Sequence, residues 1–347
     1  MNGVKRAVVI LLVAGWSLSV SSCGSSNSES KGRLRIAFGS GSHQNNSQAH
    51  WEEIKRSRPD LWVWTGNVVQ AQQKDLASLT TALDRQLRRP EYEGFRESTP
   101  VTGIWHHADF RFPKGDTHSN SEKARGAFLR FLSPLPYEPV GEGLYGSFVI
   151  KRKAFEARIV LLDTSTYARK DGNPDAPILL GAEQWGWLQT MLATARENWL
   201  VIVTPLPFFT EEFEGEKWGD YGFERAKLLR MLGVTLRDGV IILSGGRELA
   251  EILSTTSRSV GYPLYEVSVG NLNRALPFPD FGRGQYRVDE PFFEPHYGHI
   301  DLGQHDAVLA IRDMRGRSVA LVSIGRKDLV ISEKTRRLRD ITEWSID

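Results

Sequence analysis

The sequence of 347 residues has a single cysteine, Cys23. One thiol cannot form an internal disulfide, and no thiolate is left for catalysis or metal binding after residue 23. A long apolar run is missing too, because the stretch from Ala7 to Val20 is interrupted by Gly15 and Ser17. Since a helix needs ~20 apolar residues to span a bilayer, a transmembrane anchor is the less favoured explanation of this stretch.

An excess of charge of either sign is also absent. Lys5 and Arg6 are the only charged residues before Cys23, and without them the 44 basic residues fall to the same number as the 42 acidic ones. Proteins that bind nucleic acid or anionic surfaces usually carry an excess of positive charge, so a nearly neutral chain does not suggest such a partner. There is no internal repeat and no Pro/Ser-rich linker, so we expect one large α/β domain.

Residues 1–22 have the composition of an export signal. A positive start is followed by an apolar core, and Val20-Ser21-Ser22 places small residues directly before Cys23. This ending resembles the lipobox of bacterial lipoproteins, which implies that Cys23 is lipidated and becomes the mature N-terminus. The lipid on Cys23 would then make the membrane a partner of the chain.

Residues 23–32 are rich in Ser, Asn and Gly, which predicts a flexible tether. We therefore expect an exported, lipid-anchored protein of the bacterial cell envelope, at the outer membrane or facing the periplasm. Gly24 and Ser25 lack the acidic cue for inner-membrane retention, which favours the outer membrane.

Strand-like runs alternate with helical patterns along the rest of the chain. Short apolar runs predict strands at 34–38, 60–65, 101–105, 144–150, 155–162, 200–204, 240–243, 264–269, 307–312 and 318–324. Helical spacing predicts helices at 48–57, 72–88, 121–132, 181–198 and 223–232, and a further helix after Glu248. Strands that alternate with helices favour sheets flanked by helices.

The stretch from Gly239 to Leu249, GVIILSGGREL, combines an apolar strand with a glycine-rich end. Ligands of α/β proteins bind beyond the carboxyl ends of such strands, so a site is expected there. The residues delivered to this end are Gly246, Arg247 and Glu248, where a metallohydrolase needs strong metal ligands.

Eight segments resemble, in order, the landmarks of the alkaline phosphatase D (PhoD-like) family of calcineurin-like metallophosphatases. They are FGSGSHQ (38–44), PDLWVWTGN (59–67), TPVTGIWHHADF (99–110), LLDT (161–164), LGAEQWGWL (180–188), LSGGRELAE (243–251), PLYEVSVGNLN (263–273) and HYGHIDL (296–302). The resemblance implies an α/β fold, an αββα sandwich of two mixed sheets flanked by helices. It forms a single domain at 33–327, followed by a C-terminal tail at 328–347.

The resemblance also implies a phosphoesterase site with two or three metal ions, in which anionic ligands hold the ions and a shared carboxylate bridges two of them. This sequence departs from that pattern in the first two loops. The family's cysteine ligand is replaced by Gly41, and its bridging aspartate by Asn67, a neutral amide. Losing the bridge alone should cost several kcal/mol of metal binding, because two cations lose their shared anion.

The later loops depart as well. The family's Trp-Asp-Asp-His-Asp appears as Trp105-His106-His107-Ala108-Asp109. Its Ser-Gly-Asp-x-His appears as Ser244-Gly245-Gly246-Arg247-Glu248, which loses both ligands, and the arginine usual after Leu-Asp-Thr is Ser165. The motifs are degenerate while the packing landmarks persist.

Several potential ligands remain at the expected sheet edge. The vestigial positions are Gly41, His43, Asn67, His106, His107, Asp109, Gly246, Arg247 and Glu248. Among them His43, His107, Asp109 and Glu248 are weak candidates for metal ligands, of a type that suits zinc or another transition ion.

Some of these positions have alternative interpretations. Neighbouring residues on an extended segment point to opposite sides, so at most one of His106 and His107 should face the crevice. His43 and Gln44 either orient a ligand or satisfy loop backbone groups, the second being favoured. Arg247 either holds an anion or is an ordinary surface arginine, the second again being favoured.

Two functions from different classes follow. The first is a membrane-tethered pseudophosphatase, without cofactors, that acts as a binding or assembly module for an unknown protein. The alternative is an active phosphomonoesterase or phosphodiesterase with altered ligands, which would need divalent or trivalent ions such as iron and calcium, or zinc. A weaker third hypothesis is a cleft that binds a phosphorylated ligand without hydrolysing it.

Overall fold

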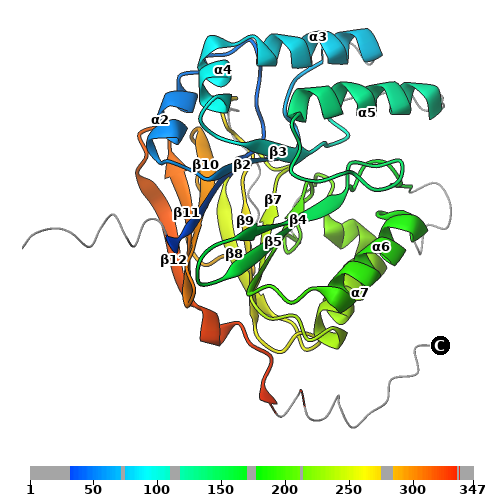
Figure 1. Cartoon of the computed structure of the whole chain (residues 1–347), viewed down its shortest axis with the longest axis vertical. Helices are drawn as coiled ribbons and strands as arrows, with labels where there is room; N and C mark the ends of the chain where they lie inside the picture. The colour runs from blue at the N-terminus through cyan, green and yellow to red at the C-terminus, as the bar shows by residue number, and fades with distance from the viewer. Residues whose placement is uncertain are drawn as a thin grey trace, which may run out of the picture.

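A computed structural model describes residues 32–71, 75–109, 118–169, 177–211, 214–274, 284–333 and 336. It contains two sheets of six strands each, and both sheets combine parallel and antiparallel pairs. The sheets lie between helices in a single domain (Figure 1). The predicted αββα sandwich of two mixed sheets is therefore confirmed.

The first sheet has the strand order β12-β11-β10-β1-β2-β3. Its strands are β1 (Leu34–Gly39), β2 (Leu61–Thr65), β3 (Val101–Ile104), β10 (His296–Leu302), β11 (Asp306–Asp313) and β12 (Ser318–Gly325). β1, β2 and β3 run parallel. The last three strands pair antiparallel, as expected for strands joined by short turns.

The second sheet has the strand order β4-β5-β6-β7-β9-β8. Its strands are β4 (Gly146–Lys151), β5 (Glu156–Leu161), β6 (Trp199–Thr204), β7 (Val240–Ser244), β8 (Glu251–Thr256) and β9 (Pro263–Ser268). The central strands β5, β6, β7 and β9 run parallel, and all residues of β6 and β7 are buried. Strands covered on both faces need continuous apolar runs, which is what the sequence supplies.

Two groups of helices enclose the sheets. They are α2 (His50–Arg56), α3 (Leu76–Leu87), α4 (Pro90–Arg96) and α5 (His118–Leu132) in one group, and α6 (Gly181–Thr194) and α7 (Gly222–Val234) in the other. Figure 1 shows the two groups on opposite sides of the strands. Short 3-10 helices, η1 (Trp218–Tyr221) and η2 (Arg326–Asp328), complete the described elements.

An aromatic cluster fixes the first helical layer to its sheet. Trp51 of α2 packs edge-on against Trp62 and Trp64 of β2, with ring centroids 5.0 and 5.5 Å away. The indole N–H of Trp64 donates to the hydroxyl of Tyr92 at 2.9 Å, so the polar atoms of these two rings are paired. Because these rings are fully buried, β2 is held firmly and the loop that follows it has a fixed starting point.

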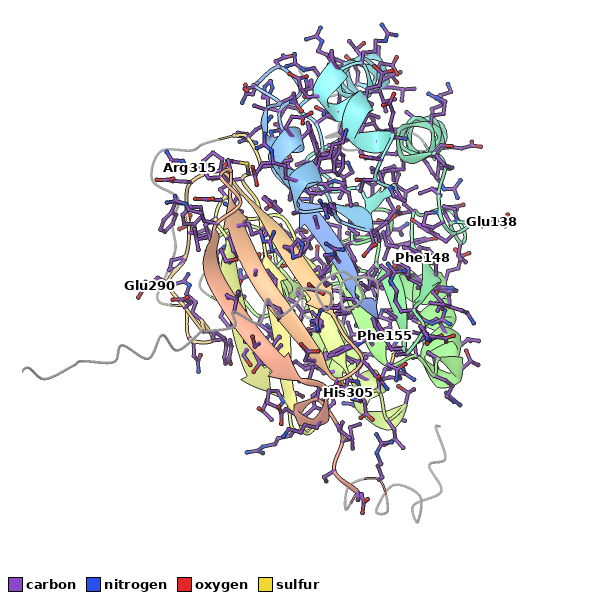
Figure 2. The ribbon with its side chains drawn as sticks, turned by 60° about the vertical axis from the view of Figure 1, so that its left-hand side comes forward. Glu138, Phe148, Phe155, Glu290, His305 and Arg315 are labelled. Carbon is purple, nitrogen blue, oxygen red and sulfur yellow. The ribbon has the colours of Figure 1, made fainter. Side chains whose placement is uncertain are left out.

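The parallel strands of both sheets deliver their carboxyl ends to a common edge. A β-carbon at Gly245, just after β7, would lie 2.2 Å from the carbonyl oxygen of Thr65 at the end of β2, so the two sheets meet there. Figure 2 shows His305, in the turn between β10 and β11, at the end of the first sheet where β1 begins. Arg315, in the turn between β11 and β12, lies at the opposite end, where β1 finishes.

Most predicted strands and helices are confirmed within a few residues, but the chain after Glu248 is wrongly predicted as a helix. It forms β8, which pairs antiparallel with β9 from Glu251 opposite Ser268. The branched residues in ILSTT disfavour a helix, and β9 offers an open edge to pair with. In addition, α6 ends at Thr194 rather than 198, and α4 was not predicted.

No helix among the described residues is long and apolar enough to cross a membrane. Cys23, the signal peptide at 1–22 and all but the last residue of the tether lie outside the described residues. At the start of the tail, Leu329 and Ile331 are buried and pack on the domain core.

Candidate functional site

The loop after β1 approaches the loop after β9 too closely to carry a side chain at the family's cysteine position. Gly41 has a φ of +68°, and a β-carbon there would lie 1.8 Å from the carbonyl oxygen of Gly270. Real β-carbons do not approach a carbonyl this closely, so a thiolate ligand does not fit at residue 41 while these loops keep their places. The glycine is required by the packing of the loops.

The loop after β7 is closed in the same way. Gly246 has a φ of +83°, and a β-carbon there would lie 2.7 Å from the carbonyl oxygen of Pro205, which follows β6. Residue 246, which is aspartate in the family motif, therefore has no room for that side chain. Two positions at which the resembled family has ligands are blocked by backbone, not merely occupied by a different residue type.

Asp109 is fully buried and joins the loops after β2 and β3. Its Oδ2 accepts hydrogen bonds from the backbone N–H of Asn67 at 2.9 Å and of His106 at 2.8 Å. Its Oδ1 accepts from Val68 at 2.6 Å and Val69 at 3.1 Å. Burial raises the pKa of Asp109 to about 6, although the four N–H groups favour the anion. Both oxygens are thus engaged with backbone, and Asp109 acts as a clamp between loops.

Asn67 stands at the position of the bridging aspartate with a φ of +50°, a backbone conformation that asparagine tolerates better than most residues. Its Oδ1, the one side-chain atom able to bind a metal, accepts a hydrogen bond from Gln70 Nε2 at 2.7 Å. Its carbonyl oxygen accepts from the backbone N–H of Ser42 at 3.1 Å. Asn67 therefore stabilises its own loop and the loop after β1.

His43 and Gln44 satisfy loop backbone groups. The Nδ1 atom of His43 accepts a hydrogen bond from the N–H of Asn45 at 3.1 Å. Gln44 pairs with the backbone of Gln70 in both directions, donating to its carbonyl oxygen at 2.8 Å and accepting from its N–H at 2.9 Å. Burial, and then the nearby charge of Arg274, lower the pKa of His43. The favoured interpretation of both residues is consistent with these contacts.

The adjacent histidines do not point to opposite sides, contrary to the extended-segment argument: their ring centroids lie 3.9 Å apart, because the chain turns at His107. His106 is 7% exposed, and its Nδ1 accepts from the N–H of Ala108 at 3.2 Å. His107 is exposed and its Nδ1 lies 3.0 Å from a carboxylate oxygen of Glu216. One ring packs inside the loop while the other pairs with a carboxylate at the surface.

The prediction that Arg247 is an ordinary surface arginine is wrong, because the residue is only 2% exposed. Its Nη1 pairs with Glu251 Oε1, and the other oxygen of Glu251 accepts from Arg287 Nε at 2.6 Å. Thr210 also donates to Glu251, at 3.1 Å. A buried guanidinium needs a buried anion, so the fold supplies Glu251 at the first position of β8.

Glu248, where the family has a histidine ligand, is exposed, and its nearest charge is Arg274 at 3.7 Å. Together, the weak metal candidates His43, His107, Asp109 and Glu248 each face a different partner. Across the described ranges from 32 to 333, no cluster of three or more His, Cys, Asp or Glu is arranged to hold an ion. The residues at this edge do not fit the metal centre implied by the resemblance.

Sequence reasoning missed two buried carboxylates that organise the same edge. Glu266 of β9 accepts from the backbone N–H groups of Phe208 at 2.8 Å and Phe209 at 2.7 Å. Burial raises its pKa to about 6. Asp163, after β5, accepts from the indole N–H of Trp105 at 2.8 Å. A lone acid in an apolar strand, as in PLYEVS, is the signal that could have predicted Glu266.

Solved structures of similar fold support the architecture. PhoD aligns with a TM-score of 0.66 and 13% identity, over 84% of this chain and 68% of its own. A purple acid phosphatase, PPD1 of yellow lupin, aligns at 0.62 and 13%, over 87% of this chain but only 56% of its own. The chain has the metallophosphatase fold.

A third structure with this metallophosphatase fold is described as "GAP50 the anchor in the inner membrane complex of Plasmodium". It aligns with a TM-score of 0.58 and 12% identity, over 88% of this chain and 91% of its own. No protein-family model matches the sequence, and no curated protein sequence matches it. At these identities the similarity concerns the fold alone.

Proposed function

We propose that this chain is a lipid-anchored pseudophosphatase that uses the metallophosphatase fold as a binding or assembly module. The observation that carries the proposal is the closure of two ligand positions by backbone. Gly41 faces the carbonyl oxygen of Gly270, and Gly246 faces that of Pro205. Restoring one ligand residue cannot rebuild a site whose loops occupy the space of the side chains.

The direction of β1 supports a tethered arrangement. The tether would enter the domain at Arg33, whose guanidinium pairs with Asp301 at 2.6 Å and with Asp306 at 3.0 Å. The closed loops lie at the other end of the strand, roughly 20 Å away for six residues. A lipid on Cys23 would thus leave the loop edge free to meet a partner. GAP50, described as an anchor, offers a precedent for such a role on this fold.

The catalytic part of the proposal is tested on the full chain purified in detergent. We expect elemental analysis to find less than one equivalent of metal, and no turnover of a chromogenic phosphoester when iron, calcium, zinc or manganese is supplied. Stoichiometric metal, together with turnover that Glu248→Ala abolishes, would establish the alternative of an active phosphoesterase with altered ligands.

The anchor is tested separately, by membrane fractionation after expression in a bacterium. Cys23→Ser should move the chain from the membrane to the soluble fraction, while Ser26→Ala in the tether serves as the matched control and should not. If Cys23→Ser stays with the membrane, the lipid anchor is wrong, and the catalytic test still stands.

A further inference from the structure

An open hollow of about 460 Å³ lies among described residues that belong neither to the closed loops nor to the proposed lipid anchor. Its walls come from α5, the loop before β4, the loop after β5 and Trp105 at the end of β3. Figure 1 shows α5 above β4 and β5. The volume is that of a small-ligand pocket, roughly 300–1,000 Å³.

The walls are held together by one buried carboxylate. Asp163 Oδ2 accepts from the indole of Trp105 at 2.8 Å and from the backbone N–H of Leu144 at 2.9 Å. Its Oδ1 accepts from the N–H groups of Ser165 at 2.9 Å and Thr166 at 3.0 Å. Three of the four walls are therefore fixed relative to one another before any ligand arrives, which lowers the ordering cost of binding.

One basic group of the lining is held in a fixed orientation. Arg125 donates through Nε to the carbonyl oxygen of Gly143 at 2.9 Å, which fixes the plane of its guanidinium. The hydroxyl of Ser165 is buried and has no hydrogen-bond partner among the described residues. This hydroxyl is not accessible from the hollow, so Arg125 is the group that a ligand meets there.

The lining carries both signs of charge. Arg125 and Arg169 are basic, while Glu122 and Glu142 are acidic. Glu122 and Arg125 are three residues apart on α5, so they are neighbours on one helix face. A phosphate would meet carboxylates as well as guanidinium groups, and an uncharged apolar ligand would offer no partner to Arg125 or Glu122.

We propose that this hollow binds a small zwitterion, an amino acid or a short peptide with free termini. The ligand's carboxylate binds Arg125, and its ammonium group pairs with Glu122. This binding does not depend on the loss of the metal site, so it goes beyond the proposed pseudophosphatase role and is tested without metal or phosphoester.

The direct test is equilibrium dialysis of the full chain in detergent against labelled alanyl-alanine. We expect saturable binding, and we expect it to weaken at least tenfold when the dipeptide is N-acetylated or converted to its amide, because each change removes one charged contact. Inorganic phosphate should not compete. No saturable binding of the dipeptide, equal binding of the capped forms, or competition by phosphate would each overturn the proposal.

Variants locate the site. Arg125→Gln should weaken binding at least tenfold, and Ser121→Trp should abolish it by filling the hollow from an exposed position on α5 that folding does not depend on. Arg130→Gln, on the same helix, exposed and outside the lining, is the matched control and should bind normally. If Arg125→Gln does not fold, Ser121→Trp decides alone, and unchanged binding in that variant contradicts the assignment.

Discussion

The carbonyl oxygen of Pro205 lies 2.7 Å from the point that a β-carbon on residue 246 would occupy. Gly246→Asp, which restores the family's ligand type, should therefore destabilise the chain by about 2–4 kcal/mol, from backbone strain at φ +83° plus the clash. It should gain no metal. Chemical denaturation and elemental analysis of the variant measure both expectations.

Gly261 offers the control for this substitution. Its φ is +86°, and no heavy atom lies within 4 Å of its β-carbon position, so Gly261→Asp brings the strain without the clash. We expect about 1–2 kcal/mol there. Equal losses at 246 and 261, or stoichiometric metal in Gly246→Asp, would contradict the view that backbone closes this position.

Asp109→Asn tests the clamp between the loops after β2 and β3. The asparagine amide has one acceptor oxygen and turns an N–H₂ group toward two of the four backbone donors. We expect a loss of about 3 kcal/mol in the free energy of unfolding, because buried donors are left unsatisfied.

The matched control for the clamp is Asp75→Asn. Asp75 caps α3 by accepting from the N–H of Ser78 at 2.7 Å, and asparagine caps a helix about as well as aspartate. A change below about 0.5 kcal/mol is expected there. A comparably small change in Asp109→Asn would show that Asp109 does not hold the loops.

The strands are predictable from the sequence because each central strand is a short continuous apolar run that ends in glycine or a small residue. The runs at Leu61–Thr65 and Val240–Ser244 are buried throughout, and their ends reveal where the loops meet. The glycines at 41 and 246 also mark two positions at which the resembled family has ligands and this sequence has none. What residue type alone does not reveal is that neighbouring backbone fills the space.

Long-range partners explain the errors. Whether Arg247 lies at the surface depends on Glu251 and Arg287, and the second of these arrives 40 residues later in the chain. The prediction of a helix after Glu248 failed for a related reason, since β8 exists only because β9 presents an edge. Local periodicity carries no information about either contact.

Arg247→Met should destabilise the chain by about 3 kcal/mol, because it leaves Glu251 buried with a single guanidinium partner, Arg287. Arg274→Met is the control, since its pairing with the exposed Glu248 spans 3.7 Å and exposed pairs contribute less than about 1 kcal/mol. Thermal unfolding of both variants at one pH provides the comparison. A near-neutral Arg247→Met would mean that the buried pair contributes no stability.

The chain should lose stability as the pH falls from about 6.5 to 4, because three histidines are buried. Burial lowers the pKa of His50 and His299 to about 3 and that of His296 to about 4, from the ordinary 6.5. Over this window the unfolded chain binds more protons than the folded chain, so stability declines toward acid. The pKa values of Asp109 and Glu266, raised to about 6, act in the opposite direction, since their protonated forms are favoured by folding.

The histidines prevail in this balance because they are three against two and their pKa shifts are larger. The contribution of one of them is isolated with His296→Gln. The imidazole accepts from the N–H of Gly270 at 3.1 Å through Nε2 and pairs with the carbonyl oxygen of Glu294 at 2.7 Å through Nδ1. Glutamine can supply the same two roles but takes up no proton, so the variant's stability should decline less between pH 6.5 and 4. Denaturation midpoints measured across this range, with exposed His305→Gln as the control, decide the point: parallel curves for the wild type and His296→Gln would contradict a neutral buried imidazole.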